Sequence, residues 1–369
     1  MLQRFFIYSL LFCSSLVLSA YEVPLVDGGR VDVPEGWNVL DSGALWVSPD
    51  GLCAFEVFVW NESNPQRALE MGRPTQAQGD AINLELWGKS GTFGDWIFPA
   101  GQEKFRGWFL ILPGDGKATR VSAFAPSDEF DKVQHRLLSA VDSYRPEGLW
   151  EGPGVVGQFL EITGSQGNAT ALSAFESTTL EWEISLDAIQ ASQDVIEREA
   201  LFLSEYVNHP NLIDAWSRYY RTVYIDAETR MESLYSALAQ GPLKPDLHSS
   251  ADVAKSLAVW MQGFSYQQIA GTSDLLTPPM ACATESGDCD SLGLAYLLLC
   301  KRYGIDGRLL ISRDAKHAVV AIDVPGEGLR WQEENGQSFL ILELTTKLPL
   351  GVLPEHLIGI DDWFSVNFS

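Results

Sequence analysis

Along the chain, the pattern of apolar and polar positions first indicates short strands. Up to about residue 145, apolar runs are separated by turn-forming Gly, Pro and Asp, and three runs are strand-like: 53–60, 105–112 and 119–125. A helical pattern at 127–144 follows, with Ser127 as its expected N-cap. We expect residues 21–147 to form an α+β domain in which helices cover an antiparallel sheet.

Beyond this part the pattern becomes helical. Residues 148–185 are Gly-rich and then strand-like, which indicates a connector with strands. Apolar residues then recur every three or four positions, and Gly241-Pro242 ends one of the three segments: 187–207, 211–241 and 250–264. Residues 186–369 are therefore expected to be a helical region that leads into a C-terminal core of helix and antiparallel sheet. The predicted fold class is α+β.

The first 20 residues have the pattern of a secretory signal peptide. Arg4 precedes an apolar stretch from Phe5 to Leu18, and Ser19-Ala20 follows as a cleavage site. The stretch is short for a membrane span, although an uncleaved anchor is the alternative. We expect an exported protein, periplasmic or secreted, with no membrane segment after cleavage.

Charge narrows the class of partner. The chain has 25 Lys and Arg against 49 Asp and Glu, a net charge of −24, and loss of Arg4 with the signal peptide makes it −25. Nucleic acids and anionic membranes need clusters of basic residues, and none is present. The expected partner is a peptide or protein substrate. A basic substrate would suit the negative charge of the chain.

Tryptophan is concentrated in the N-terminal part. Seven of the 12 Trp lie between Trp37 and Trp150. They either pack into the core of the predicted sheet, the more common arrangement, or line an aromatic groove.

One cysteine has a chemically distinctive position. The apolar segment from Cys289 to Arg302 predicts a buried helix, with Asp288 or Ser286 as its N-cap and Gly304 after its end. The free N–H groups of a first turn stabilise a thiolate, whereas the neighbouring Asp288 and Asp290 oppose it. The alternative interpretation is a small buried hydrophobic residue, and we expect Cys282 and Cys300 to be unpaired residues of that kind.

A base and an acid follow on predicted strands. His317 begins the run 317–324, and Glu343 lies in the run 338–346. A carboxylate on a neighbouring strand can accept from one imidazole nitrogen and orient the other toward a thiol. Each residue also has a non-catalytic alternative: His317 as a structural histidine and Glu343 as a solvent-facing glutamate.

These blocks resemble a known superfamily. GDCDSLGLAYLLLCKRYGID at 287–306, His317-Ala-Val-Val and LELTT at 342–346 look like the three blocks of transglutaminase-like proteins. The resemblance covers residues 250–350 and implies a papain-like core with Cys289 as nucleophile, His317 as base and acid, and Glu343 as orienter. Glu343 departs from the commoner Asp. Separately, the segments VPEGW, SPDG and FDKVQHRLLSAVDSYRP weakly resemble the Mog1/PsbP-like sandwich.

The predicted function is an exported cysteine peptidase or amidase that works through a thioester, without cofactor or metal. Asp290, Asp288 and Tyr266 are expected to support the site. A protein-crosslinking transglutaminase and a catalytically idle domain in a binding or scaffold protein are the alternatives. A metal site built from the same acids with Cys289 and His317 is a further alternative, whose spacing matches no short zinc motif.

Overall fold

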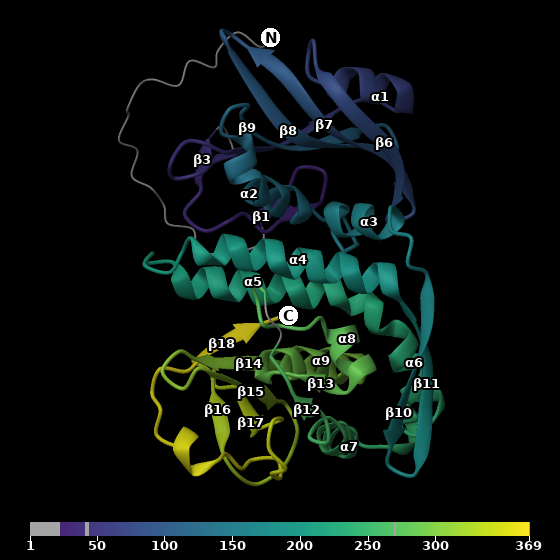
Figure 1. Ribbon diagram of the computed structural model, residues 1–369, viewed down its shortest axis with the longest axis vertical. Coiled ribbons are helices and arrows are strands. Elements are labelled where there is room, and N and C mark those ends of the chain that lie inside the picture. Colours follow the sequence, from purple (N-terminus) through teal and green to yellow (C-terminus); the bar gives the residue numbers. More distant parts are fainter. Residues whose placement is uncertain (1–22, 41–43, 269–270, 369) are drawn as a thin grey trace. The chain divides into compact units, whose positions relative to one another are not determined.

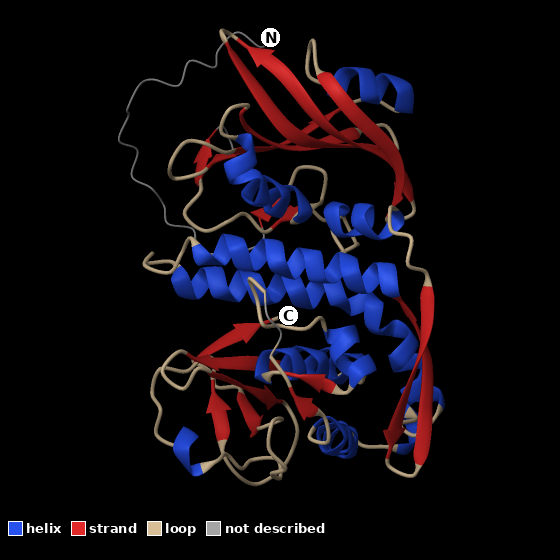
Figure 2. Ribbon diagram, viewed as in Figure 1, coloured by secondary structure: helices blue, strands red, loops and turns tan. Residues whose placement is uncertain are grey.

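The computed structural model describes residues 23–40, 44–268 and 271–368. The expected signal peptide, 1–20, lies outside the described residues. Helices and antiparallel sheets occur together in the chain, which confirms the α+β class (Figures 1 and 2). The chain divides into two compact units: one contains the part up to Trp150 with 154–159 and 208–215, and the other contains the rest.

The first unit contains an antiparallel sheet in the order β3-β4-β5-β9-β8-β7-β6. Its strands are β3 (Asn38–Leu40), β4 (Leu45–Val47), β5 (Ala54–Trp60), β6 (Gln78–Leu86), β7 (Lys89–Ala100), β8 (Glu103–Pro113) and β9 (Ala118–Pro126). The three predicted strand-like runs lie in β5, β8 and β9. A separate pair, β1 (Val23–Pro24) and β2 (Arg30–Val31), precedes the sheet.

Helices cover the sheet because its strands bury apolar residues on both faces. Helix α2 (Phe130–Asp142) packs on β8 and β9 through its buried apolar residues, and α1 (Pro65–Gly72) packs on β8 through Ala68. The expected N-cap was wrong: Glu129 precedes α2, and no side chain caps it. Ser127 instead donates its backbone N–H to the carbonyl oxygen of Lys104 at 2.9 Å, which holds it to the sheet.

Most tryptophans of this unit pack rather than line an open groove. Trp37, Trp46 and Trp96 are buried, and Trp96 packs against Phe109 with ring centroids 5.3 Å apart. Trp60 and Trp108 are half-buried.

The segment 148–185 contains more regular structure than a connector with strands. It includes the helix α3 (Val155–Ile162) and the hairpin of β10 (Asn168–Phe175) and β11 (Thr178–Ser185). Every second residue is buried or half-buried in β10 from Ala169 on and in β11 from Leu180 on, for example Phe175 and Trp182. This alternation is that of strands with one face on a core.

The second unit contains the predicted helices, together with α8 (Pro278–Thr284), which the sequence pattern did not predict. The predicted helices are α4 (Leu186–Ser204), α5 (Leu212–Glu228, counted from residue 216 on in this unit), α6 (Glu232–Gln240), α7 (Ser250–Met261) and α9 (Cys289–Arg302). The expected helix 211–241 is broken by a 3-10 turn at Thr229–Met231, and Gly241 ends α6 as predicted. Further 3-10 turns lie at Pro245–Leu247 and Glu355–Leu357.

The C-terminal sheet of this unit packs against α9. Its order is β16 (Arg330–Gln332), β17 (Ser338–Leu342), β15 (His317–Ile322), β14 (Gly307–Ser312) and β18 (Phe364–Asn367), all antiparallel. Helix α9 is buried on all sides except at Asp290 and its last turn, as expected of a helix that is apolar all round. Gly293 permits the close approach, because a Cβ there would lie 2.6 Å from Leu309 Cδ1 on β14.

Candidate active site

Cys289 is the first residue of α9, and hydrogen bonds on both sides fix this helix start. The Asp288 carboxylate accepts from the backbone N–H of Ser291 at 2.8 Å and from its hydroxyl at 2.5 Å. Strand β13 (Ser286–Gly287) pairs in parallel with β12 (Ser265–Tyr266), which places Tyr266 opposite the residue before Asp288. Asp288, rather than Ser286, is therefore the N-cap.

The Cys289 thiol lies between an acid and a strand. Its side chain is mostly buried, with the residue 8% exposed, and its S–H donates to Asp290 Oδ1 at 3.2 Å. Burial raises the pKa of the thiol, the charge of Asp290 raises it further, and the backbone N–H of Ala318 acts in the opposite direction. Burial and the charges of the two acids therefore favour the thiol over the thiolate, against the effect of the helix start.

His317 and Glu343 form a close polar pair in the sheet half of the site. His317 begins β15, Glu343 directly follows β17, and these two strands are antiparallel neighbours. The His317 Nε2 atom lies 2.6 Å from Glu343 Oε2. The other carboxylate oxygen accepts from the backbone N–H and the hydroxyl of Thr345, at 2.6 and 2.7 Å.

Glu343 is an anion held in the interior. It is 1% exposed, and burial alone would raise its pKa. The hydrogen bond and charge of His317, together with the two bonds from Thr345, reverse this and lower the pKa of Glu343. Glu343, although longer than the commoner Asp, thus contacts the imidazole directly through Oε2, and Thr345 holds its other oxygen, Oε1.

The two halves of the site are adjacent, and the contact between them comes from the backbone of the sheet half. Ala318 directly follows His317, and its N–H interacts with Cys289 Sγ, so the strand that carries the imidazole begins beside the thiol. Because Nε2 is engaged by Glu343, Nδ1 is the nitrogen left to serve the sulfur. Within the described residues, no hydrogen bond joins Cys289 to His317, since the thiol donates to Asp290 instead.

Tyr220 is a member of the site that the sequence did not reveal. It lies on α5, is 6% exposed, and donates its hydroxyl to Asp290 Oδ2. Burial raises the pKa of Asp290, the bonds from Tyr220 and Cys289 lower it, Asp274 raises it, and the result is a raised value. Nothing in the helical pattern around Tyr220 distinguishes it from Tyr219, whose hydroxyl lies 2.9 Å from Ser273 Oγ.

The remaining predicted residues surround the thiol. Asp288 is 3% exposed, and burial, with the charge of Asp290, raises its pKa to about 7. Tyr266 is 56% exposed, and partial burial and the nearby Cys289 and Asp288 raise the pKa of its hydroxyl. Tyr266 therefore lies at the exposed rim of the site.

Comparison with known proteins leaves the family open. No family model matches the chain. No curated protein matches it either. Solved structures are similar only at low TM-scores. Cyanobacterial PsbP (CyanoP) from Synechocystis has a TM-score of 0.29 at 14% identity, covering 37% of this chain and 98% of that one.

Two further structures are similar to a comparable degree. LpqN of Mycobacterium tuberculosis, whose title places it in cell envelope biogenesis, has a TM-score of 0.24 at 15% identity, covering 30% of this chain and 79% of its own. A Bacteroides thetaiotaomicron protein covers 84% of this chain and 88% of its own, at 7% identity and a TM-score of 0.26. A PsbP-like protein is thus among the similar structures, and the transglutaminase-like resemblance stays a hypothesis.

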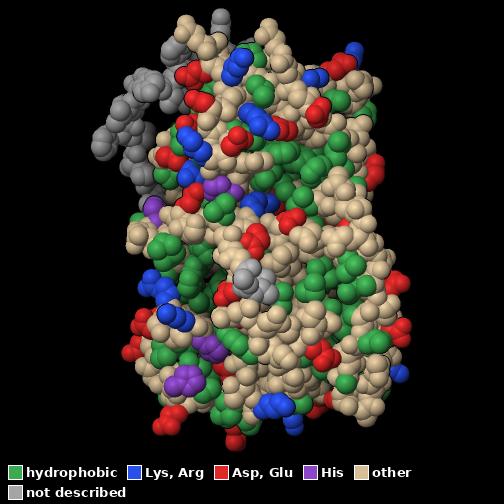
Figure 3. All heavy atoms as spheres, in the orientation of Figure 1, with side chains coloured by type: hydrophobic (Ala, Val, Ile, Leu, Met, Phe, Trp, Pro, Cys, Tyr) green, Lys and Arg blue, Asp and Glu red, His purple; other side chains and the backbone are tan. Residues whose placement is uncertain are grey.

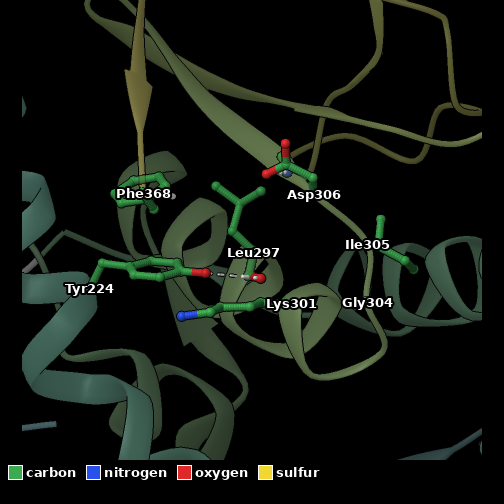
Figure 4. Close-up of a pocket in the computed structure, with 8 residues that line it drawn as sticks. Tyr224, Leu297, Lys301, Gly304, Ile305, Asp306 and Phe368 are labelled. Atoms are coloured by element: carbon green, nitrogen blue, oxygen red, sulfur yellow. Dashed lines mark hydrogen bonds between the residues drawn. The ribbon is translucent and has the colours of Figure 1, made fainter. Parts of the chain in front are cut away.

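Other features of the described residues lie apart from the site. A cavity of about 200 Å³ is lined by the stacked rings of Tyr224 and Phe368 and by Lys301 and Asp306, and it includes none of the predicted site residues (Figure 4). In the part of the chain described, no group of three or more His, Cys, Asp or Glu is arranged to hold a metal ion. No described helix is long and apolar enough to cross a membrane.

Charge and cysteine chemistry do not single out a second site. Asp and Glu side chains are spread over the face seen in Figure 3. The cysteines of the described residues, Cys53, Cys282, Cys289 and Cys300, are buried and unpaired. Burial raises the pKa of the Cys53 and Cys300 thiols to about 12.

Proposed function

We propose that this protein is an exported cysteine peptidase or amidase in which Cys289, His317 and Glu343 form the catalytic triad. The observation that carries the proposal is the 2.6 Å contact of His317 Nε2 with the buried Glu343, at the start of a strand whose next N–H interacts with Cys289 Sγ. Export rests on the apolar segment 5–18, and a peptide or protein is the substrate.

The reaction begins with a rotation of the Cys289 side chain from Asp290 toward His317. The thiol proton passes to Nδ1, and the sulfur attacks the amide carbonyl carbon. His317 returns the proton to the departing amine nitrogen as the C–N bond breaks, which leaves a thioester. His317 then takes a proton from water, and the resulting hydroxide attacks the thioester. The C–S bond breaks to release the acid product, and His317 returns its proton to the sulfur, which restores the Cys289 thiol.

Glu343 holds His317 in position during this cycle. Its carboxylate stabilises the imidazolium that forms twice per turnover, and the Thr345 bonds prevent it from turning away. At the start of α9, the backbone N–H of Cys289 serves as an oxyanion donor for the tetrahedral intermediate.

The decisive experiment measures cleavage of casein-type and peptide substrates by the mature chain and by Cys289→Ala. We expect Cys289→Ala to lose all measurable hydrolysis. Cys53→Ala is the matched control, because Cys53 is also buried but lies in the other unit. Unchanged cleavage by Cys289→Ala would refute the proposal. Thioester transfer to an added amine, assayed in parallel, separates a crosslinking enzyme from a hydrolase.

A catalytically idle domain is the second candidate, and the resting thiol favours it. Burial and Asp290 raise the pKa of Cys289, as burial does for the other cysteines. Labelling of Asp290→Asn by iodoacetamide at neutral pH discriminates, because this variant lacks the carboxylate that accepts the thiol proton: an activated Cys289 reacts faster than Cys53, Cys282 and Cys300. Equal rates for all four would support a binding or scaffold role.

A further inference from the structure

Asp290 connects the nucleophile to a buried tyrosine. Its Oδ1 accepts the Cys289 S–H at 3.2 Å, and its Oδ2 accepts the hydroxyl of Tyr220. The Tyr220 ring is buried on α5 and lies edge-to-face with Tyr219, with centroids 5.0 Å apart. One oxygen of the carboxylate is thus fixed by the core, and the other is directed at the sulfur.

This arrangement competes with the proposed triad for one proton. The S–H can point to only one acceptor, and in the structure that acceptor is Asp290 and not His317 Nδ1. A carboxylate beside the sulfur also disfavours the thiolate by Coulomb repulsion. The titratable groups around Asp290 and the thiol are Asp288 and Cys289 on α9, Tyr219 and Tyr220 on α5, His317 on β15, Asp274 and Tyr266.

We propose that Asp290, oriented by Tyr220, is a positioning residue that keeps Cys289 protonated and turned away from His317 until substrate binds. A substrate N–H that donates to Asp290 Oδ1 takes the place of the thiol, which then rotates to His317 and transfers its proton to Nδ1. Substrates with a free N–H beside the scissile carbonyl, as in a peptide backbone, would release the nucleophile. This inference rests on the proposed function.

The partial exposure of Asp290 supports such an exchange. Asp290 is half-buried, whereas the residues on either side of it along α9, Cys289 and Ser291, are buried. Asp290 is therefore the residue of this helix start that retains exposed surface. Tyr220 prevents the carboxylate from rotating away when the thiol leaves, so the oxygen stays available to the incoming N–H.

The test measures the rate at which iodoacetamide alkylates Cys289, resolved by peptide mass spectrometry, from pH 5 to pH 10. In Asp290→Asn we expect the midpoint of the rate profile to fall by at least one pH unit, about a tenfold faster reaction below the midpoint. Tyr220→Phe should shift it in the same direction but less. Tyr219→Phe, which leaves Asp290 bonded to Tyr220, is the matched control and should keep the wild-type midpoint.

The other cysteines report on folding in the same samples. In a folded variant Cys282 and Cys300 stay protected, because both are fully buried. If Asp290→Asn unfolds, Tyr220→Phe carries the test. An unchanged or higher midpoint in the folded variants would overturn the inference.

The proposed function and the Asp290 inference can be rejected independently of each other. Alkylation does not require turnover, so a lowered midpoint with no cleavage of casein-type substrates keeps the Asp290 device and rejects the peptidase. Cleavage that depends on Cys289, with an unchanged midpoint in Asp290→Asn, does the reverse.

Discussion

The two halves of the candidate site differ in how their surroundings affect ionised side chains: the sheet half stabilises a charge and the helix half opposes it. On the sheet, His317 and Glu343 are complementary, and the pKa of the buried Glu343 is lowered by its partners. On the helix, Cys289 lies between Asp288 and Asp290, and the pKa of all three groups is raised. In the proposed mechanism, His317 would thus be the base already oriented by its partner, and Cys289 the nucleophile kept protonated by its neighbours.

The difference comes from the number of compensating donors. Glu343 receives bonds from an imidazole, a backbone N–H and a hydroxyl, which offset the cost of burying a carboxylate. Asp288 and Asp290 repel each other, and Asp274 adds to the repulsion. In the proposed mechanism, the reactivity of the site is therefore controlled in the helix half. There, exchange of one hydrogen bond at Asp290 frees the thiol to transfer its proton.

The largest effect is expected from the base. His317→Ala should lower peptidase activity by about 10²–10⁴-fold, because the thiol loses its proton acceptor and the leaving amine its donor. The measurement is kcat/KM on a peptide substrate. His356→Ala, an exposed histidine on the 3-10 turn Glu355–Leu357, is the control. Equal activity in the two variants would remove His317 from the mechanism.

Asp288→Asn tests the repulsion in the helix half. The folded pKa of Asp288, about 7, lies above its unfolded value, so its ionisation costs stability as the pH rises from about 4 to about 7. Asn retains the N-cap, so the variant should be more stable than wild type above pH 7 by about 2–4 kcal/mol. Urea unfolding at pH 4 and pH 8 measures this, and an equal difference at both pH values would contradict it.

Glu343→Gln tests the sheet half of the site, where removal of the charge is expected to lower stability rather than raise it. The folded pKa of Glu343 lies below its unfolded value of about 4.3, so its charge stabilises the fold above that pH. The variant should lose about 1–3 kcal/mol of unfolding free energy at neutral pH. The gap to wild type should close as the pH falls below 4. A gap that is independent of pH would mean that the charge of Glu343 contributes nothing to stability.

The smallest effect is expected at the rim. Tyr266→Phe removes a hydroxyl from a side chain that is 56% exposed, and should change unfolding free energy by less than about 0.5 kcal/mol. Activity should stay within about threefold of wild type, which corresponds to less than 1 kcal/mol in the barrier. A larger loss of kcat at unchanged KM would show that the hydroxyl acts on the reacting atoms.

The elements of the site were predictable because their signals are local. The apolar run from Leu292 to Leu299 predicts a buried helix, and Asp288, which caps it, is one of the two expected N-caps, the other being Ser286. The α+β class follows from the same patterns, whereas the short helices α1, α3 and α8 were not predicted. The cap of α2 was missed because Ser127 bonds to Lys104, a residue distant in sequence.

The sequence by itself determined which residue types begin α9 and β15 and which acid follows β17. Only the tertiary structure decided that His317 meets Glu343, because strand pairing brings together residues far apart in the chain. It also decided the state of Cys289. The helix start favours a thiolate, but burial and the Asp290 carboxylate held by Tyr220 from α5 reverse that preference. Desolvation and contacts between elements have no local sequence signal, since both depend on what packs around a group.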